Sequence, residues 1–372
     1  MGEGWKTTFF RERTLPMQRS IERRLREKGI ECPTIELRVV YVIHHLEENA
    51  RTIRAELEDA DIFIPEFVST DEKQRMARGP GFGGIDGYRI FKHSSFEEFT
   101  SPLADVVRRR NIPVGIVDSP LETTIGKTAS DAAHARTDIL SKKTLEEMTR
   151  GYRENDDKCW PAQRAREHYM ADHLEDELVR MIIETPALQK NGKKIRAVMY
   201  LGMAHQPFSN LVRKQIKTAS IVCPTVRESK SPEMEITEMH MRGEKPADAL
   251  IHSTLIENQL IASWHTLRWA ADIEKSKRYR FEAACARAAR LLTPFARDIL
   301  ESRVQIIPEP DAFNRDPAHA RWLLLMMQRY ESILMQAFNQ EGLSYSDFVP
   351  KRVVPLETPE AILARRWKER AA

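Results

Sequence analysis

Two segments of the chain repeat one pattern, in which an apolar run ends in a histidine and a helix-like spacing follows. They are VVYVIHHLEENARTIRAEL, from Val39, and VMYLGMAHQPFSNLVRKQI, from Val198. Short apolar runs of this kind are typical of buried strands, and apolar residues at intervals of three and four are typical of helices. Strand-like runs alternate with helical segments from Ile35 onward, which is the order of βαβ units with parallel strands. The sequence therefore predicts an α/β fold with a mainly parallel sheet flanked by helices.

The predicted core covers residues 35–230. Strands are expected at 35–43, 61–67, 112–118 and 198–201, with a short strand near Ile221. The segment between Asp131 and Glu184 has helical spacing, and Pro161 is expected to interrupt it because proline removes a backbone donor. The sequence thus places most of the core in alternating strands and helices.

The pattern changes at both ends of this core. Residues 1–34 contain a basic helical segment stopped by Gly29 and Pro33, and we expect an N-terminal helical extension there. Residues 231–372 contain three long amphipathic segments, at 247–264, 279–302 and 318–340, separated by loops with proline. This part is predicted to be a C-terminal all-helical module that caps the core or joins two chains in a homodimer.

Charge and cysteine content exclude several classes of partner. Lysine and arginine number 58 against 55 aspartate and glutamate residues, so the chain has no strong field for nucleic acid. No uncharged stretch approaches the roughly 20 residues that cross a bilayer. The four cysteines form no CxxC pair, which favours reduced thiols. We therefore expect a cytoplasmic protein with no nucleic-acid or membrane partner.

Polar residues lie where several predicted strands end. His44 and His205 end the two repeated segments, Glu66 ends the strand at 61–67, and Asp118 ends the strand at 112–118. Because the carboxyl ends of parallel strands form one ligand-binding edge, these residues are expected to converge. Two imidazoles and a carboxylate can bind a divalent metal and leave positions open. The predicted ligands are His44, Glu66 and His205; alternatively, each is only a polar residue finishing a strand.

Arg166 gives an independent indication of a site. It lies one helical turn before the stripe Met170, Leu174, Leu178 and Ile182, which is expected to face the core. A buried guanidinium group needs a partner, which would be a carboxylate of the protein, an anionic group of a substrate, or water at the helix end. The alternative is that the helix begins late and leaves Arg166 in solvent.

These motifs together resemble those of the TraB/PrgY and Tiki family, part of a wider group that includes erythromycin esterases and ChaN-like proteins. GMAH at 202–205 is similar to the second GxxH motif of that family, and Glu66 to its acidic strand end. REHYMADHL from Arg166 resembles the arginine-bearing helix, and DSPLETTIGK from Asp118 a segment with a threonine six residues on, here Thr124. The resemblance covers about residues 35–222.

The resemblance implies a metal-dependent hydrolase that acts as a peptidase in the manner of the Tiki proteins, although some relatives are regulators that bind peptides. It implies manganese, zinc, iron or cobalt as the metal, with His45, Gly202 and Thr124 supporting the ligands. The first GxxH motif departs from the family because Tyr41 stands in place of glycine. His45 is therefore an alternative to His44, which we favour because it keeps the spacing to Asn49.

The predicted function is hydrolysis of a peptide or a related amide or ester bond in a peptide or small-molecule substrate. Glu66, Asp118 and Arg166 are the predicted catalytic residues. Arg166 would hold a carbonyl oxygen or a substrate carboxylate, and Asp118 would orient a histidine or the attacking water. GxSxG is absent, so no serine nucleophile is indicated. The alternatives are an inactive peptide-binding or regulatory protein of the TraB/PrgY type and a scaffold whose C-terminal helices recruit a partner.

Overall fold

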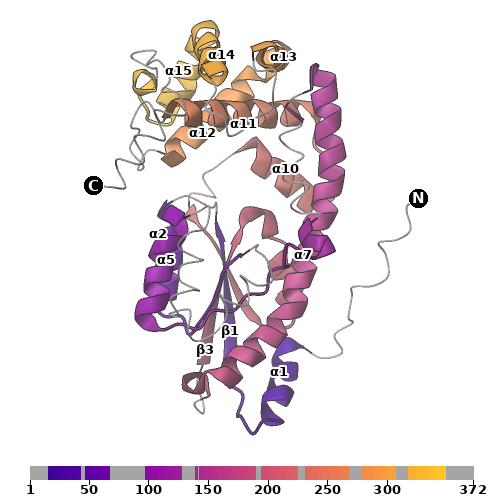
Figure 1. The fold of residues 1–372 in the computed structure, drawn as a ribbon, viewed down its shortest axis with the longest axis vertical. Helices are drawn as coiled ribbons and strands as arrows, with labels where there is room; N and C mark the ends of the chain where they lie inside the picture. Colours follow the sequence, from indigo (N-terminus) through magenta and orange to yellow (C-terminus); the bar gives the residue numbers. More distant parts are fainter. Residues whose placement is uncertain are drawn as a thin grey trace, which may run out of the picture. The chain divides into compact units, whose positions relative to one another are not determined.

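A computed structural model describes residues 16–42, 47–67, 97–127, 139–140, 142–189, 194–224, 231–268, 278–306 and 317–348. The chain divides into two compact units. The first comprises Met1–Arg136 and Tyr152–Lys245, and the second comprises Thr137–Gly151 and Pro246–Ala372. Figure 1 shows the helices and strands of both units, coloured along the sequence.

The first unit is built on a parallel sheet, as predicted. Its strands are β1 (Thr34–Val42), β2 (Ile62–Ile64), β3 (Lys194–Gly202) and β4 (Lys217–Val222), in the order β2-β3-β1-β4. β3 pairs with β1 from Thr34↔Lys194 to Val42↔Gly202, and the β2–β3 and β1–β4 pairs are also parallel. The four carboxyl ends therefore lie at one edge of the sheet.

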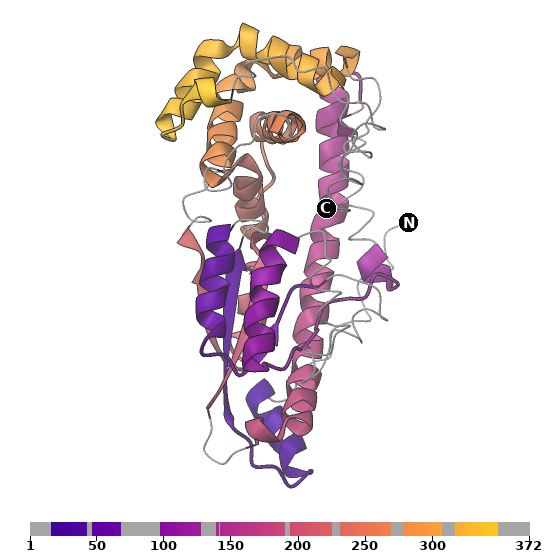
Figure 2. The same ribbon diagram turned by 60° about the vertical axis from the view of Figure 1, so that its left-hand side comes forward.

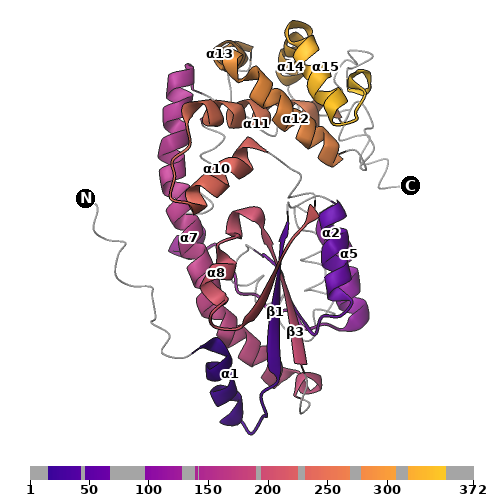
Figure 3. The ribbon, with the colours of Figure 1, turned by 180° about the vertical axis from the view of Figure 1, so that it is seen from behind.

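Helices cover both faces of this sheet. The helices α1 (Met17–Arg26), α7 (Leu145–Glu184) and α8 (Phe208–Val212) lie on one face, and α2 (Glu47–Leu57) and α5 (Glu97–Arg110) lie on the other (Figure 3). Figure 2 shows α2 and α5 side by side. Successive residues of a strand point to opposite faces. Accordingly, Val39 packs in the cluster that contains Leu174 of α7, whereas Val40 packs with Ile53 of α2.

The strand predicted at 112–118 forms only a single bridge. Val114 pairs in parallel with Phe63, but the N–H of Ile116 donates to Oε1 of Glu177 in α7 at 2.8 Å instead of to a strand. Pro65 follows β2 and has no N–H to extend the pairing. The segment still runs beside β2, which brings Asp118 to the same edge of the sheet.

The predicted interruption at Pro161 is wrong, because α7 continues through it. A proline inside a helix removes the hydrogen bond to the carbonyl four residues earlier, here that of Asp157. Asp157 is exposed, so water can replace the missing donor. Further along the helix Met170, Leu174 and Leu178 are fully buried, and their packing holds the helix in place.

Two further elements belong to the first unit. Met17, Ile21 and Leu25 of α1 are fully buried in its core, so the N-terminal helix is part of the packed structure. Helix α10 (Pro232–Met241) follows the predicted boundary at 231 but groups with the first unit. The ring of His240 in α10 stacks on Trp160 of α7, with 4.9 Å between ring centroids.

The described part of the second unit is helical outside its turns. It contains α11 (Asp248–Arg268), α12 (Arg278–Leu292), α13 (Ala296–Ile306), α14 (Pro317–Arg329) and α15 (Glu331–Gln340). The predicted segment 279–302 is divided by a 3-10 turn at Thr293–Phe295, which contains Pro294. Phe338 packs against Phe281, Tyr345 and Phe348 in the core of this unit. Among the described helices, none has both the length and the apolar character needed to cross a membrane.

Gly126 closes the turn that follows Asp118, and it has no room for a side chain. A Cβ atom there would lie 2.2 Å from the carbonyl oxygen of Pro120, which is backbone and cannot move aside cheaply. Gly126→Ala should therefore lower the free energy of unfolding of the first unit by about 1–3 kcal/mol. Urea denaturation followed by tryptophan fluorescence measures this change.

Gly151→Ala is the matched control for this variant. Gly151 lies inside helix α7. A Cβ atom there would contact only the side chain of Ile139, at an ordinary van der Waals distance of 3.6 Å. Alanine should stabilise that helix by roughly 0.5–1 kcal/mol. Equal effects of the two substitutions would contradict the assignment of steric crowding to Gly126.

Candidate functional site

The carboxyl edge of the sheet gathers four of the residues predicted from the sequence. Glu66 lies two residues after β2, His205 three residues after β3, and Asp118 at the end of the segment beside β2. Arg166 reaches them from the interior of α7. The structure therefore brings Glu66, Asp118, Arg166 and His205 into one network of contacts, all within the first unit.

Arg166 is the centre of this network. Its guanidinium donates from Nε to Oδ1 of Asp118 at 2.7 Å, and from Nη2 to Oδ2 of Asp118 at 2.5 Å and to Oε1 of Glu66 at 2.9 Å. Burial by itself would lower the pKa of Arg166, but the charges of Asp118 and Glu66 outweigh it and raise the pKa. Arg166 is thus a buried, permanently charged group held by two carboxylates.

Asp118 holds the Arg166 guanidinium with both of its oxygens. Both of its carboxylate oxygens accept hydrogen bonds from Arg166, and Oδ1 also accepts from the N–H of Ser119 at 2.9 Å. Within the described residues it contacts no histidine. Asp118 therefore fixes Arg166 rather than a histidine ring.

Glu66 is anchored to the end of β3. Its own N–H donates to the carbonyl of Tyr200 at 3.2 Å, and its Oε2 accepts from the N–H of Gly202 at 2.6 Å. The other oxygen, Oε1, lies 3.3 Å from Nε2 of His205. Gly202 thus supports the site through its backbone, by orienting the carboxylate toward His205.

His205 is 2% exposed and has a carboxylate facing each ring nitrogen. Nε2 faces Glu66, and Nδ1 lies 3.4 Å from Oε1 of Glu167. Burial lowers the pKa of His205 and the nearby guanidinium of Arg166 also lowers it, but Glu66 and Glu167 have the larger combined effect and raise the pKa. The imidazole therefore lies in an electronegative environment suited to a proton or a cation.

Three site residues were not predicted from the sequence: Gln163, Arg164 and Glu167. The amide nitrogen of Gln163 lies 2.7 Å from Nδ1 and 2.9 Å from Nε2 of His205. Arg164 pairs with Glu167 and donates to the carbonyl of Ala204 at 2.9 Å. All three lie within one turn of Arg166 on α7, and this spacing was the signal available in the sequence.

Tyr41 stands where the related motif has glycine, and the structure shows what it does. Its hydroxyl donates to the carbonyl of Gln206 at 3.0 Å, accepts from the N–H of Ser209 at 3.1 Å, and lies 2.5 Å from Oγ of Ser209. Ser220 in turn donates to Ser209 at 2.8 Å. Burial raises the pKa of Tyr41 to about 12, so the hydroxyl stays protonated. Tyr41 therefore ties β1 to the loop that carries His205.

Three further residues were predicted to support or bind at the site, namely His44, His45 and Thr124. His44 and His45 lie outside the described residues, although Val42, two positions before His44, pairs with Gly202. Thr124 is exposed, and it is the hydroxyl of Thr123 that bonds to the carbonyl of Pro120 at 2.7 Å. Thr123 therefore shapes the turn that follows Asp118.

The spacing of donor atoms fits one shared cation. Two ligand atoms about 2.1 Å from one ion, at a tetrahedral angle, are about 3.4 Å apart. Nε2 of His205 and Oε1 of Glu66 are 3.3 Å apart. Within the described ranges no group of three such ligands is present, and His44 lies outside those ranges. Two of the three predicted ligands, Glu66 and His205, therefore lie close together among the described residues.

The charges of the described site residues are nearly balanced. Three carboxylates, those of Glu66, Asp118 and Glu167, face the two guanidinium groups of Arg164 and Arg166. With a neutral His205 ring, this arrangement keeps one net negative charge. A cation near His205 would therefore be electrostatically favoured.

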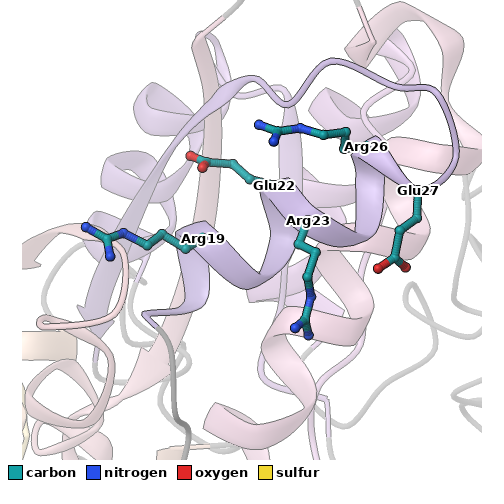
Figure 4. Close-up of a pocket in the computed structure, with 5 residues that line it drawn as sticks. All are labelled: Arg19, Glu22, Arg23, Arg26 and Glu27. Atoms are coloured by element: carbon teal, nitrogen blue, oxygen red, sulfur yellow. The ribbon is translucent and has the colours of Figure 1, made fainter.

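A second candidate is a pocket of about 370 Å³ on the surface of α1 (Figure 4). Its lining residues are Arg19, Glu22, Arg23, Arg26 and Glu27. The figure shows side chains of both signs projecting from α1 and from Glu27, the residue that follows it. Mixed charge on a solvated helix face indicates no ligand class, and the edge of the sheet remains the stronger candidate.

No family model, curated protein or solved structure matches the chain. The resemblance to the TraB/PrgY and Tiki family thus stays a prediction, carried by the motifs at Glu66, Asp118, Arg166 and 202–205.

Removal of the Arg166 guanidinium should be costly, because it leaves Asp118 and Glu66 buried without their cation. Arg166→Met is expected to destabilise the first unit by about 3–5 kcal/mol. The double variant Arg166→Met/Asp118→Leu should recover part of this loss, since it removes an uncompensated charge. Denaturant unfolding of the single and double variants gives the coupling energy, and strictly additive losses would refute the pairing.

Loss of the Tyr41 hydroxyl should loosen the His205 loop. Tyr41→Phe leaves the Ser209 N–H and the Gln206 carbonyl without their partner, at a cost of about 1–3 kcal/mol. Amide hydrogen exchange should be faster at 206–209 in this variant, whereas exchange in β4 should change little. Unchanged exchange at 206–209 would show that the hydroxyl does not hold the loop.

Proposed function

We propose that the first unit is a metal-dependent hydrolase that cleaves a peptide or a related amide or ester bond. The observation that carries the proposal is the 3.3 Å approach of His205 Nε2 to Glu66 Oε1 at the carboxyl edge of the sheet. Ligands of α/β proteins bind at such an edge. The resemblance of the surrounding motifs to the TraB/PrgY and Tiki family supports the same reaction class.

His44 is the third ligand in this proposal. It follows Val42 by two residues, and two residues extend at most about 7 Å. Val42 is itself paired with Gly202, whose N–H binds Glu66. The short length of chain between Val42 and His44 therefore allows the His44 imidazole to be the third ligand, beside Glu66 and His205. Manganese, zinc, iron and cobalt all accept histidine and carboxylate ligands, so the ion is specified only as divalent.

The residues of the chain have separate tasks in this reaction. His44, Glu66 and His205 would hold the divalent ion, which would supply Lewis acidity toward a carbonyl oxygen. Nε and Nη2 of Arg166 are engaged by Asp118 and Glu66, whereas Nη1 makes no hydrogen bond within the described part of the chain. Nη1 is thus the donor available for a substrate oxygen. Asp118 keeps the guanidinium plane in place while that contact forms.

A second function, peptide binding without turnover, has one observation in its favour. Tyr41 replaces the glycine that lets backbone approach a ligand in the related motif, and its side chain is buried. A chain altered at this position can keep the fold and the charged network while it lacks hydrolysis. This alternative predicts peptide binding that needs no metal.

Metal binding separates the two functions. Protein stripped with a chelator and titrated with Mn²⁺, Zn²⁺ or Co²⁺ in a calorimeter should bind about one ion per chain. His205→Ala and His44→Ala should each weaken binding by more than about 100-fold, beyond the roughly 10- to 100-fold cost of losing an outer partner. The loaded protein should hydrolyse members of a peptide, amide and ester library, and both variants should lose that activity.

His173→Ala is the matched control. His173 also lies on α7, but it stacks on Tyr169 and its Nδ1 contacts the Tyr169 carbonyl, away from the site. Its removal should leave metal affinity unchanged. Wild-type protein that binds peptide but no metal would support the regulatory function, and metal retained in His205→Ala would refute the ligand assignment.

A further inference from the structure

We infer that Glu167 is a positioning residue that fixes the His205 ring so that Nε2 presents its lone pair to a divalent cation. This inference rests on the proposed function and adds a residue that the sequence motifs do not indicate. Glu167 is 1% exposed and follows Arg166 directly on α7. Adjacent helix residues point about 100° apart, so Arg166 meets the carboxylates while Glu167 meets the imidazole.

The contact geometry gives each ring nitrogen its own carboxylate. Oε1 of Glu167 is 3.4 Å from Nδ1, and Oε1 of Glu66 is 3.3 Å from Nε2 of His205. A neutral imidazole has one N–H and one lone pair. If Nδ1 carries the proton and donates to Glu167, the lone pair on Nε2 faces Glu66. A histidine that binds a metal through one nitrogen commonly donates from the other to a carboxylate.

Glu167 is well held for this task. Its other oxygen, Oε2, pairs with Arg164, whose guanidinium also donates to the carbonyl of Ala204 and lies 4.1 Å from the centroid of the Trp160 ring. Arg164 therefore connects Glu167 to the residue immediately before His205. Arg164, which lies on the same helix as Glu167, thus fixes the Glu167 carboxylate relative to the His205 ring.

One buried atom requires an explanation that this role provides. Oε1 of Glu167 is shielded from solvent and forms no hydrogen bond in the described structure. A buried acceptor without a donor costs about 1–3 kcal/mol. A His205 ring protonated at Nδ1 can supply the missing donor, because a small rotation of the ring shortens the 3.4 Å separation between Nδ1 and Oε1.

Gln163 should weaken cation binding at His205, whereas Glu167 should strengthen it. Its amide nitrogen lies within 2.9 Å of both ring nitrogens and can donate only to a nitrogen that has a lone pair. With Nδ1–H directed at Glu167, that nitrogen is Nε2, the same atom that would bind the cation. Gln163 therefore competes with the cation, whereas Glu167 assists it.

Metal titration of matched variants tests the inference. Calorimetric titration with Zn²⁺ and Mn²⁺ should show about 10-fold weaker binding for Glu167→Gln and up to about 100-fold for Glu167→Ala. Glu167→Asp should recover part of the loss. Gln163→Ala should bind at least as tightly as the wild type. Unchanged affinity in Glu167→Gln and Glu167→Ala would overturn the inference.

Glu177→Gln controls for a purely structural effect. Glu177 is a second buried carboxylate on α7, and it accepts hydrogen bonds from the N–H of Ile116 and from Arg180. This variant should lose stability without losing metal affinity. Equal losses of affinity in Glu177→Gln and Glu167→Gln would show that Glu167 acts only through stability.

Nitrogen NMR of the His205 ring gives a readout independent of activity and of metal. Metal-free wild-type protein, studied on the alkaline side of the ring titration, should show the tautomer protonated at Nδ1. Glu167→Ala should shift the population toward the tautomer protonated at Nε2. A wild-type ring protonated at Nε2 overturns the inference even if the variants do not fold. Absence of metal binding by the wild type overturns the proposed function instead.

Discussion

The site depends on burying one positive charge where three chain segments meet. The Arg166 guanidinium leaves water and is compensated by Asp118 and Glu66, which follow separate segments of the sheet. Removing ions from water costs several kcal/mol each, and good geometry with full hydrogen bonding is needed to offset that cost. The positions of α7, β2 and the segment before Asp118 are therefore mutually constrained.

The neighbouring strands extend this constraint to His205. Glu66 binds the last amide of β3 from one side, and Tyr41 of β1 binds the loop after His205 from the other. The end of β3 and the loop that follows it are thus held by side chains from β1 and from the segment just after β2, the two strands that pair with β3. A catalytic or binding histidine needs this kind of support, since small displacements of a ligand or a base greatly reduce its effect.

Much of the fold was predictable because its signals are local. Strand periodicity and strand ends predicted the parallel sheet and the convergence of Glu66 and Asp118 at one edge. The failures have specific physical causes. In the segment 112–118, the N–H of Ile116 donates to a side chain of α7 and not to a neighbouring strand. The helix α7 continues through Pro161 because its other residues are well packed. Both outcomes depend on tertiary contacts that a local pattern does not contain.

The candidate site was predictable only to the level of residues, not of roles. The apolar stripe on α7 indicated that Arg166 would be buried, but not that it would contact Asp118 and Glu66 together. Glu167 looked like one of many charged helix residues, because its pairing with Arg164 and its approach to His205 exist only after folding. Charged residues in a helix have many possible partners, and the fold selects among them.

The attachment of Glu66 to Gly202 has a consequence for recognising related chains. The Glu66 carboxylate accepts a hydrogen bond from the main-chain N–H of residue 202, a group that every residue except proline possesses. His205 follows three residues later. The contact therefore depends on the number of residues between Glu66, Gly202 and His205, and it places few demands on the side chains in between. Distant homologues are therefore better sought by the intervals around the strand ends than by overall identity.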